Sequence, residues 1–311
     1  MTRRPLQNIS ASVRQRLLTH AKEHGSNYDR VLARYAIERL LFRLSQTEAR
    51  DDYFLKGAML FATWPAHAFR PTGDLDLLGH GNADPAAIIE LFTHICQVEV
   101  PEDGIIFDTT TLRHETIRED ETYQGISLSL SGRLGTAIVP VQVDIGFGDS
   151  VYPAPQWATF PVLLPELPPA KLLMYPPETV VAEKFEALVR FGERNSRLKD
   201  FYDIWVATRT FPFDLATLVE AIGGTLRRRE TLAPTSLPVA LTPRFAEMPD
   251  TQGLWSGFLR RTPPTLPPPP LADLLAELRR FFAPVLPALA VPETAKGRWN
   301  PDRTTWEQAD F

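Results

Sequence analysis

The chain has 311 residues, of which 44% are hydrophobic and 23% charged, so it holds enough apolar material for two domains with their own cores. The formal net charge of −5 argues against indiscriminate binding to nucleic acid, although it leaves room for a local basic surface. One cysteine excludes an internal disulfide, and no apolar run approaches the ~18 residues that a membrane helix needs, so we expect a cytoplasmic protein without a membrane partner.

Apolar residues at helical spacing predict two helices in the first fifty residues. Ser10 can cap the first helix, and Ser26 or Asn27 can cap the second, because short polar side chains accept hydrogen bonds from the first helical N–H groups. The helices lead into an apolar run, residues 54–61, which Gly57 interrupts. A glycine there could bring backbone N–H groups close to a phosphate at the start of a helix.

The most informative segment follows at residues 70–78, where two aspartates stand one residue apart. On a strand, side chains at positions i and i+2 leave the same face, so Asp74 and Asp76 would share a cleft while Leu75 and Leu77 enter the core. Alone the pattern is weak evidence, since many exposed strand ends carry one. Two such carboxylates repel each other unless a divalent cation neutralises them, and oxygen ligands suit Mg²⁺ or Mn²⁺ better than zinc.

The next segments predict a helix over residues 86–97 and several strands over residues 105–149. Serine alternates with leucine in residues 127–132, which is typical of a half-buried strand. In residues 139–149, valine and isoleucine alternate with polar positions around Asp144, so this strand could bring a third carboxylate to the same cleft. A helix followed by antiparallel strands with acids on their edges indicates an α+β module.

Six prolines between residues 153 and 169 interrupt regular structure and suggest a connection between two modules. We therefore expect one domain over residues 1–165 and a second, mostly helical domain over residues 166–311. A proline-rich stretch at 263–270 should be extended and stiff before a last helix near 271–282.

The tail from residue 292 is expected to be poorly ordered, except where Trp299 and Trp306 dock it.

Basic residues gather in two places of the second half. The first set lies within residues 184–199, and the second is Arg227, Arg228 and Arg229. Arg190, Arg194 and Arg197 recur at helical spacing, so they could form a stripe for phosphates or an ordinary solvated helix face.

Charged residues just beyond the first basic set also allow two interpretations. Lys199 and Asp203 could form a surface ion pair at i,i+4 spacing, yet the apolar residues around them indicate a buried helix. A buried carboxylate needs a partner.

Five blocks of this sequence, in order, resemble the AbiEii/AbiGii toxin family, which includes the MenT toxins and belongs to the nucleotidyltransferase fold shared with DNA polymerase β. A glycine turn, two acids on one strand and one acid on a later strand form the layout of that fold. The blocks lie between residues 54 and 205 and read Leu55-Lys56-Gly57-Ala58-Met59-Leu60, Arg70-Pro71-Thr72-Gly73-Asp74-Leu75-Asp76, Val141-Gln142-Val143-Asp144, Glu183-Lys184-Phe185-Glu186-Ala187-Leu188 and Arg197-Leu198-Lys199-Asp200-Phe201-Tyr202-Asp203-Ile204.

The resemblance implies an α+β fold, with a nucleotidyltransferase core and N-terminal helices in residues 1–165 and a helical domain in residues 166–311 that completes the active site. It also implies the site residues. The expected metal ligands for Mg²⁺ or Mn²⁺ are Asp74, Asp76 and Asp144; the expected NTP contacts are Lys56, Gly57, Ala58 and Arg70; and the further catalytic residues are Lys184 with Asp200 or Asp203.

Two positions limit what the resemblance implies. Ala58 stands where the fold usually has a serine, so no hydroxyl is present to hold a phosphate, and backbone N–H groups would have to do so. Arg70 could contact the triphosphate or pair with Asp74.

The function implied by the resemblance is metal-dependent transfer of nucleotides from an NTP to an acceptor such as the tRNA 3′ end, which inhibits translation. A cognate antitoxin encoded nearby would be the protein partner, and the basic positions 190–199 and 227–229 would contact the RNA backbone. Two alternatives stay open: the same chemistry on a protein or small-molecule hydroxyl, or an inactive nucleotide-binding pseudo-enzyme, which Ala58 suggests.

Overall fold

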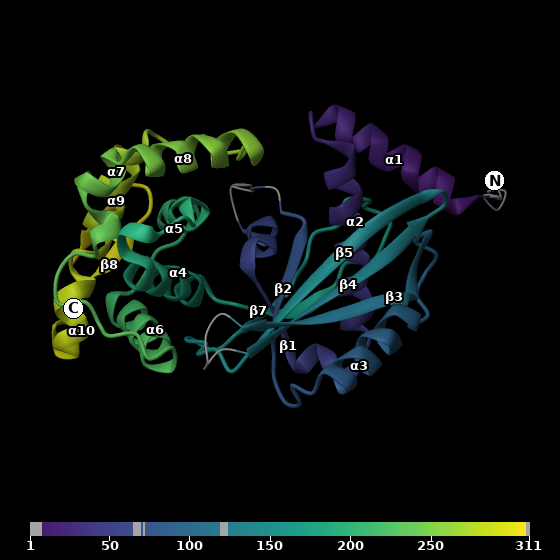
Figure 1. Ribbon diagram of the computed structural model, residues 1–311, viewed down its shortest axis with the longest axis horizontal. Coiled ribbons are helices and arrows are strands. Elements are labelled where there is room, and N and C mark those ends of the chain that lie inside the picture. The colour runs from purple at the N-terminus through teal and green to yellow at the C-terminus, as the bar shows by residue number, and fades with distance from the viewer. Residues whose placement is uncertain (1–7, 65–69, 71, 119–123, 309–311) are drawn as a thin grey trace. The chain divides into compact units, whose positions relative to one another are not determined.

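The computed structural model describes residues 8–64, 70, 72–118 and 124–308, and the two compact units of its chain are treated separately below (Figure 1). Pro71 of the aspartate motif lies outside the described residues. Unit 1 comprises Met1–Thr63, Pro71–Gly148 and Trp157–Met174, and unit 2 comprises Trp64–Arg70, Asp149–Gln156 and Tyr175–Phe311. Among the helices of the described residues, none combines the length and apolarity that crossing a bilayer requires.

Unit 1 is built on strands, and the seven strands of the large sheet are β1 to β7. Its elements, with η for a 3₁₀ helix, are α1 (Ile9–Glu23), α2 (Tyr28–Ser45), η1 (Glu48–Asp51), β1 (Tyr53–Lys56), η2 (Gly57–Thr63), β2 (Asp74–Gly79), α3 (Pro85–Gln97), β3 (Ile105–Arg118), β4 (Gln124–Leu134), β5 (Ala137–Phe147), β6 (Gln156–Thr159) and β7 (Lys171–Met174).

The sheet is mixed, in the order β3-β4-β5-β2-β1-β7-β6. Strand β2 lies in the middle, where it is parallel to β5 and antiparallel to β1, while β3, β4 and β5 form an antiparallel meander. Helix α2 packs against β5, and α3 packs against β3. Leu75, Leu77 and Val143 are no more than 1% exposed, so alternate strand residues enter the core as the sequence predicts.

The helix starts follow the expected chemistry with one correction. Helix α1 begins after Asn8, whose side chain accepts a hydrogen bond from Ala11 N, so the prediction that Ser10 caps this helix is wrong. Ser10 lies in the first turn instead and donates to the carbonyl of Gly104 at 2.7 Å. Asn27 caps α2 by accepting from Arg30 N at 3.1 Å, as one of the two expected caps.

Unit 2 is mostly helical, which confirms an α+β chain with a helical C-terminal region. Its elements are α4 (Pro177–Phe191), η4 (Gly192–Arg194), α5 (Leu198–Thr210), α6 (Leu215–Arg228), η5 (Val239–Leu241), α7 (Pro243–Glu247), α8 (Pro249–Arg261), α9 (Leu271–Phe282), α10 (Val285–Ala290), η6 (Pro292–Thr294), β8 (Arg298–Asn300) and β9 (Thr305–Glu307).

The expectation of a poorly ordered tail is wrong for residues 298–307, whereas the expectation that Trp299 and Trp306 dock this segment is confirmed. Strands β8 and β9 pair into an antiparallel hairpin, with Trp299 opposite Trp306. Trp299 is 2% exposed, and its indole N–H donates to the carbonyl of Thr208 at 2.6 Å. The indole of Trp306 donates to the carbonyl of Phe281 at 2.9 Å. Two large apolar side chains whose N–H groups find carbonyl partners therefore dock the tail.

Helix α2 holds the segment between β6 and β7 through buried charged side chains. Glu38 is fully buried, and its Oε2 accepts from Leu163 N at 2.7 Å, while its Oε1 lies 3.4 Å from Arg39 Nε. Arg39 Nη2 donates to the carbonyl of Pro168 at 2.8 Å. Burial raises the pKa of Glu38 to about 7, even though the neighbouring Arg39 opposes this rise.

This raised pKa makes the contribution of Glu38 to stability depend on pH. Between the unfolded pKa of 4.5 and about 7, the native carboxyl binds more protons than the unfolded one, so its contribution is largest at low pH and is lost as pH rises. We expect the unfolding free energy of wild type relative to Glu38→Gln to fall by roughly 2–3 kcal/mol between pH 5 and pH 8. Urea unfolding measures it, with the exposed Glu99→Gln as a control. A difference independent of pH would contradict the raised pKa.

Candidate active site

The three predicted metal ligands share one face of the unit 1 sheet. Strands β2 and β5 run parallel in a register that makes Asp76 the direct partner of Asp144 and Asp74 the partner of Gln142. Directly paired residues, and alternate residues of one strand, point to the same face. Asp74 is exposed, and Asp76 and Asp144 are half-buried. The structure thus places on one face of the sheet three carboxylates that lie up to 70 residues apart in the chain.

The carboxylate of Asp144 has two polar partners that the sequence analysis missed. Ser127, its direct partner on β4, donates from Oγ to Asp144 Oδ1 at 2.6 Å. Gln142 donates from Nε2 to both carboxylate oxygens, at 3.1 and 3.2 Å. The alternation in residues 127–132 and 139–149 was the available signal, because it puts both side chains on the exposed face. These bonds fix the orientation of the Asp144 carboxylate.

On the other side of the acids, β1 ends in a turn that fits tightly against Asp76. Lys56 is the direct partner of Asp76 across β1 and β2, and Gly57 follows with a φ of +69° at the start of η2. A Cβ on Gly57 would lie 1.9 Å from Asp76 Oδ2. Glycine is therefore required here both for its backbone conformation and for the room that the carboxylate takes. Ala58 is 4% exposed, so its methyl group packs inside.

The donor set of this face suits a hard divalent cation. Three carboxylates offer only oxygen ligands, which Mg²⁺ and Mn²⁺ prefer. Within the described part of the chain, no three acidic, histidine or cysteine side chains already converge on one point. Neighbouring strands lie only about 4.8 Å apart, so rotation of the side chains of Asp76 and Asp144 could bring their oxygens to one ion.

The remaining predicted residues form a buried charge cluster in unit 2. Arg70 donates from Nε and Nη2 to the two carboxylate oxygens of Asp203, at 2.7 and 2.9 Å. Lys184, on α4, lies 2.7 Å from Asp200 and 2.8 Å from Asp203, both on α5. Arg197 Nε lies 2.7 Å from the second oxygen of Asp200. Both aspartates are 0% exposed, and the side chain of Lys184 is 12% exposed.

Mutual attraction keeps these buried groups ionised. Burial alone would raise the pKa of Asp200, but Lys184 and Arg197 lower it to about 2. Burial likewise opposes the lowered pKa of Asp203, to which Arg70 and Lys184 contribute most. The pKa of Lys184 is raised, because the two carboxylates outweigh its desolvation. Three cations against two anions leave the cluster with one net positive charge at neutral pH.

Two sequence interpretations change with this geometry. Asp203 is fully buried and bonds Arg70 and Lys184, which excludes an exposed pair with Lys199. Asp200 and Asp203 both form ion pairs with Lys184. The sequence predicted that only one of the two aspartates would lie beside the lysine. The bidentate contact of Arg70 with Asp203 was not foreseen.

Of the basic positions expected to contact RNA, Arg229 does not fit that role. Its side chain is 13% exposed and pairs with Asp149 at 3.2 Å and Glu186 at 3.1 Å. These carboxylates and Glu183 raise the pKa of Arg229 although burial opposes them. Arg190 and Arg194 are exposed. The expected stripe along one helix is wrong, because α4 ends at Phe191, Arg194 lies in η4 and Arg197 precedes α5.

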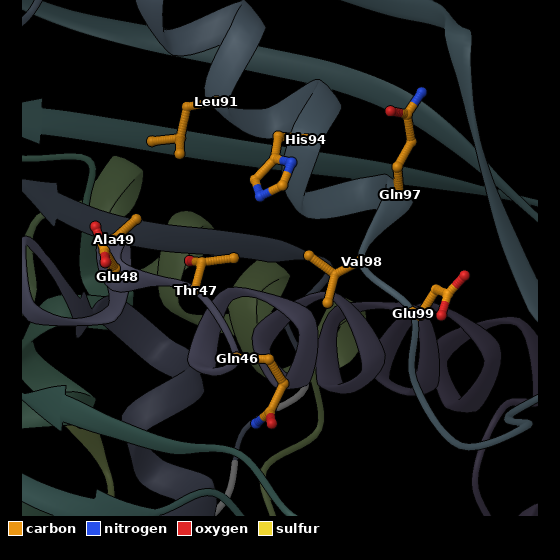
Figure 2. Close-up of a pocket in the computed structure, with 9 residues that line it drawn as sticks. All are labelled: Gln46, Thr47, Glu48, Ala49, Leu91, His94, Gln97, Val98 and Glu99. Carbon is orange, nitrogen blue, oxygen red and sulfur yellow. The ribbon is translucent and has the colours of Figure 1, made fainter.

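A surface pocket of about 630 Å³ in unit 1 contains none of the predicted site residues. It lies where the C-terminal end of α2 and η1 meet the C-terminal end of α3, with Thr47 and His94 among its labelled side chains (Figure 2). Most of its polar side chains, including Glu48 and Glu99, are exposed.

The fit of Gly57 against Asp76 can be tested with a matched glycine. Gly25 has a similar φ of +60°, but a Cβ there meets nothing within 4 Å. We expect Gly25→Ala to cost about 1 kcal/mol of unfolding free energy from backbone strain alone. Gly57→Ala should cost clearly more, because it must also displace the Asp76 carboxylate. Urea unfolding of both variants measures the difference. Equal losses of unfolding free energy would show that the Asp76 carboxylate can move away from a Cβ at position 57 without cost.

The sequence profile of the nucleotidyl transferase AbiEii toxin of type IV toxin–antitoxin systems matches residues 39–277, which include every predicted site residue. Comparison with curated proteins gives no match. Among solved structures, JHP933 from Helicobacter pylori is similar at 13% identity and a TM-score of 0.42, over 82% of this chain and 90% of that one.

An antigenic nucleotidyltransferase-like protein from Paracoccidioides brasiliensis is similar at 13% identity and a TM-score of 0.34, over 76% of this chain and 91% of that one. The match of the family profile covers well over half of the chain. The chain therefore belongs to the AbiEii family of nucleotidyltransferase toxins of type IV toxin–antitoxin systems, which implies an NTP as its substrate and an antitoxin as its partner.

Proposed function

We propose that this nucleotidyltransferase uses Mg²⁺ or Mn²⁺ to transfer a nucleotide from an NTP to the 3′ end of tRNA, and so inhibits translation in the cytoplasm. The observation that carries the metal-dependent chemistry is the shared sheet face of Asp74, Asp76 and Asp144, with the last two as direct partners. Family membership supports the NTP and the role as a toxin. The tRNA acceptor follows from the resemblance to the MenT toxins.

In this proposal, Asp74 and Asp76 act on the NTP, and Asp144 acts on the acceptor. When bound, divalent ions would neutralise the triphosphate and make the acceptor hydroxyl easier to ionise. Asp74 and Asp76 would hold ions against the phosphates, beside Lys56 and the backbone of Gly57. Asp144 would serve the acceptor side, where Ser127 and Gln142 keep its carboxylate in place.

The reaction then needs one displacement at the α-phosphorus. The 3′ oxygen of the acceptor forms a bond to this phosphorus while the bond to the bridging oxygen breaks, and pyrophosphate leaves. Asp144 accepts the proton of the acceptor hydroxyl. Because the carboxylate is already oriented by two donors, little reorganisation is needed during proton transfer.

Lys184 is proposed to stabilise the charge that develops on the phosphates. Its raised pKa keeps the ammonium charged, and Asp200 and Asp203 fix its position. Arg70 is buried and bonds both oxygens of Asp203, so its proposed role is to hold that aspartate against the lysine rather than to contact the triphosphate itself.

The assignment is tested by label transfer. Purified protein is incubated with Mg²⁺, each α-³²P-labelled NTP in turn and total tRNA, and the products are separated on a denaturing gel. We expect wild type to label tRNA with one preferred NTP and Asp74→Asn to lose at least about 100-fold in rate, since a metal ligand is removed. The exposed Asp51→Asn in the same unit should stay active.

Other outcomes of this assay would contradict the proposed site or the proposed acceptor. Full activity of Asp74→Asn would sink the proposed site. Label on protein alone would favour a protein hydroxyl as the acceptor, and no label on any macromolecule would favour a small-molecule acceptor or a pseudo-enzyme.

The hydrogen bond from Ser127 to Asp144 generates a second prediction. Ser127→Ala should lower kcat about fivefold, because a hydrogen bond to the catalytic carboxylate contributes about 1 kcal/mol. Ser127→Thr keeps the hydroxyl and should restore most of the rate. The KM for the NTP should stay unchanged in both variants, and Ser26→Ala, an exposed serine outside the site, should behave as wild type. An unchanged kcat in Ser127→Ala would show that the hydrogen bond from Ser127 to Asp144 does not contribute to catalysis.

A further inference from the structure

We propose that the exposed face of β3, β4 and β5 is the surface on which the acceptor lies, as a single strand of RNA that reaches Asp144 with its 3′ end. This acceptor face consists of Arg113, Ser129, Ser131, Arg133, Ile106 and Ile138. The inference rests on the proposed function and names the part of unit 1 that receives its acceptor. It assigns the RNA to the sheet of unit 1 rather than to the basic positions 190–199 and 227–229 that the sequence favours.

Strand register connects this face with the catalytic acids. Arg113 on β3 is paired with Ser129 on β4, Ser129 with Gln142 on β5, and Gln142 with Asp74 on β2. These four residues therefore form one row across the sheet, about 14 Å long from the first Cα to the last at the usual strand spacing. Arg113 and Ser129 are both exposed.

A second row marks the far end of the face. Ile106 on β3 is paired with Arg133 on β4, and Arg133 with Ile138 on β5. Both isoleucines are 71% exposed, and Arg133 is exposed between them. Ser131 lies one row closer to the acids, since rows on one face follow every second residue, about 7 Å apart.

The order of the strands decides which substrate lies on which side. Lys56 and Gly57 flank Asp76 on the β1 side, where the NTP is proposed to bind. Asp144 flanks it on the β5 side, and Ser127 on β4 is the next residue outward. A polymer whose terminal hydroxyl lies at Asp144 therefore continues over β4 and β3 if it avoids the nucleotide.

The side chains of the face suit a single-stranded RNA. Serines are small and leave the sheet surface flat, and their hydroxyls can donate to phosphate oxygens. Arg113 and Arg133 can pair with phosphates, and Arg113 is already held at the β3 irregularity by its bonds to the carbonyls of Thr110 and Leu112. The exposed isoleucines offer apolar contact to bases.

The charge of the face predicts a modest affinity. Asp108, paired with Ser131, and Glu115, paired with Ser127, oppose the two arginines. Two phosphate contacts give a slope of about −1.4 for log affinity against log salt on a single strand. Weak binding of this kind is compatible with a chain of net charge −5.

The experiment measures binding of a short 5′-fluorescein-labelled single-stranded RNA by anisotropy, without NTP, at several salt concentrations. We expect Arg113→Glu and Arg133→Glu each to weaken binding about five- to tenfold and to flatten the salt slope by about 0.7. Ser129→Glu with Ser131→Glu should weaken it similarly. In the label-transfer assay, these variants should raise the KM for the acceptor and leave the KM for the NTP unchanged.

Matched variants separate this face from other surfaces. Arg50→Glu changes the same charge on an exposed residue of unit 1 away from the face and should bind RNA as wild type does. The proposal is overturned if wild type does not bind the RNA, if Arg133→Glu binds as wild type does, or if Arg50→Glu weakens binding equally. It is also overturned if binding is lost only in Arg190→Glu with Arg194→Glu, or if the acceptor is found to be a protein.

Failure of the proposed function would give a different result. Binding needs no turnover, so an inactive site leaves the anisotropy differences intact while no label is transferred. Conversely, an active site with a different acceptor surface transfers label at an unchanged KM in the variants of the acceptor face.

Discussion

The parallel register between β2 and β5 is the constraint on which the site in unit 1 depends. It makes Asp76 the direct partner of Asp144, and the same register aligns Asp74 with Gln142. Because side chains on a sheet alternate between faces, a shift of one residue would send Asp144 into the core and Val143 to the surface. The apolar partners Leu75 and Val143, which are at most 1% exposed, resist such a shift. Core packing thus holds the carboxylates together although they repel each other.

The neighbours of these acids are fitted to them from both sides. On one side, Gly57 leaves the space that the Asp76 carboxylate fills. On the other, Ser127 and Gln142 donate to Asp144. Because the proposed oxygen ligands lie on strands of one sheet, they are positioned more rigidly than ligands on loops would be, and such preorganisation would favour the proposed catalysis.

Unit 2 uses a different physical principle to hold its charged residues. Asp200 and Asp203 are completely buried, and desolvation of two carboxylates would be costly without Lys184, Arg197 and Arg70. The cluster satisfies each carboxylate with two cations, so removing one partner leaves a buried charge that is only partly compensated. All of these contacts form together in only one arrangement of α4, α5 and residue 70. The charged residues Lys184, Asp200 and Asp203 therefore lie between the two helices rather than on their surface.

Local patterns in the sequence were sufficient to predict most of the elements and the faces of their residues. Alternation predicted that Asp74 and Asp76 point to the same face of the sheet. Asn27, as one of two candidate caps, and Gly57 at the start of η2 were also recognised, because each follows from neighbours within a few residues. The family and the fold were recognisable from short blocks in a fixed order.

Contacts between distant parts of the chain were decided only by the tertiary structure. Ser127 and Gln142 became partners of Asp144 through strand register, and Arg70 met Asp203 across 133 positions. Arg229 forms ion pairs with Asp149 and Glu186. The tail forms a hairpin in which Trp299 is buried. The physical reason is that periodicity determines the side of an element on which a residue lies, whereas its partner depends on which elements pack together and in which register.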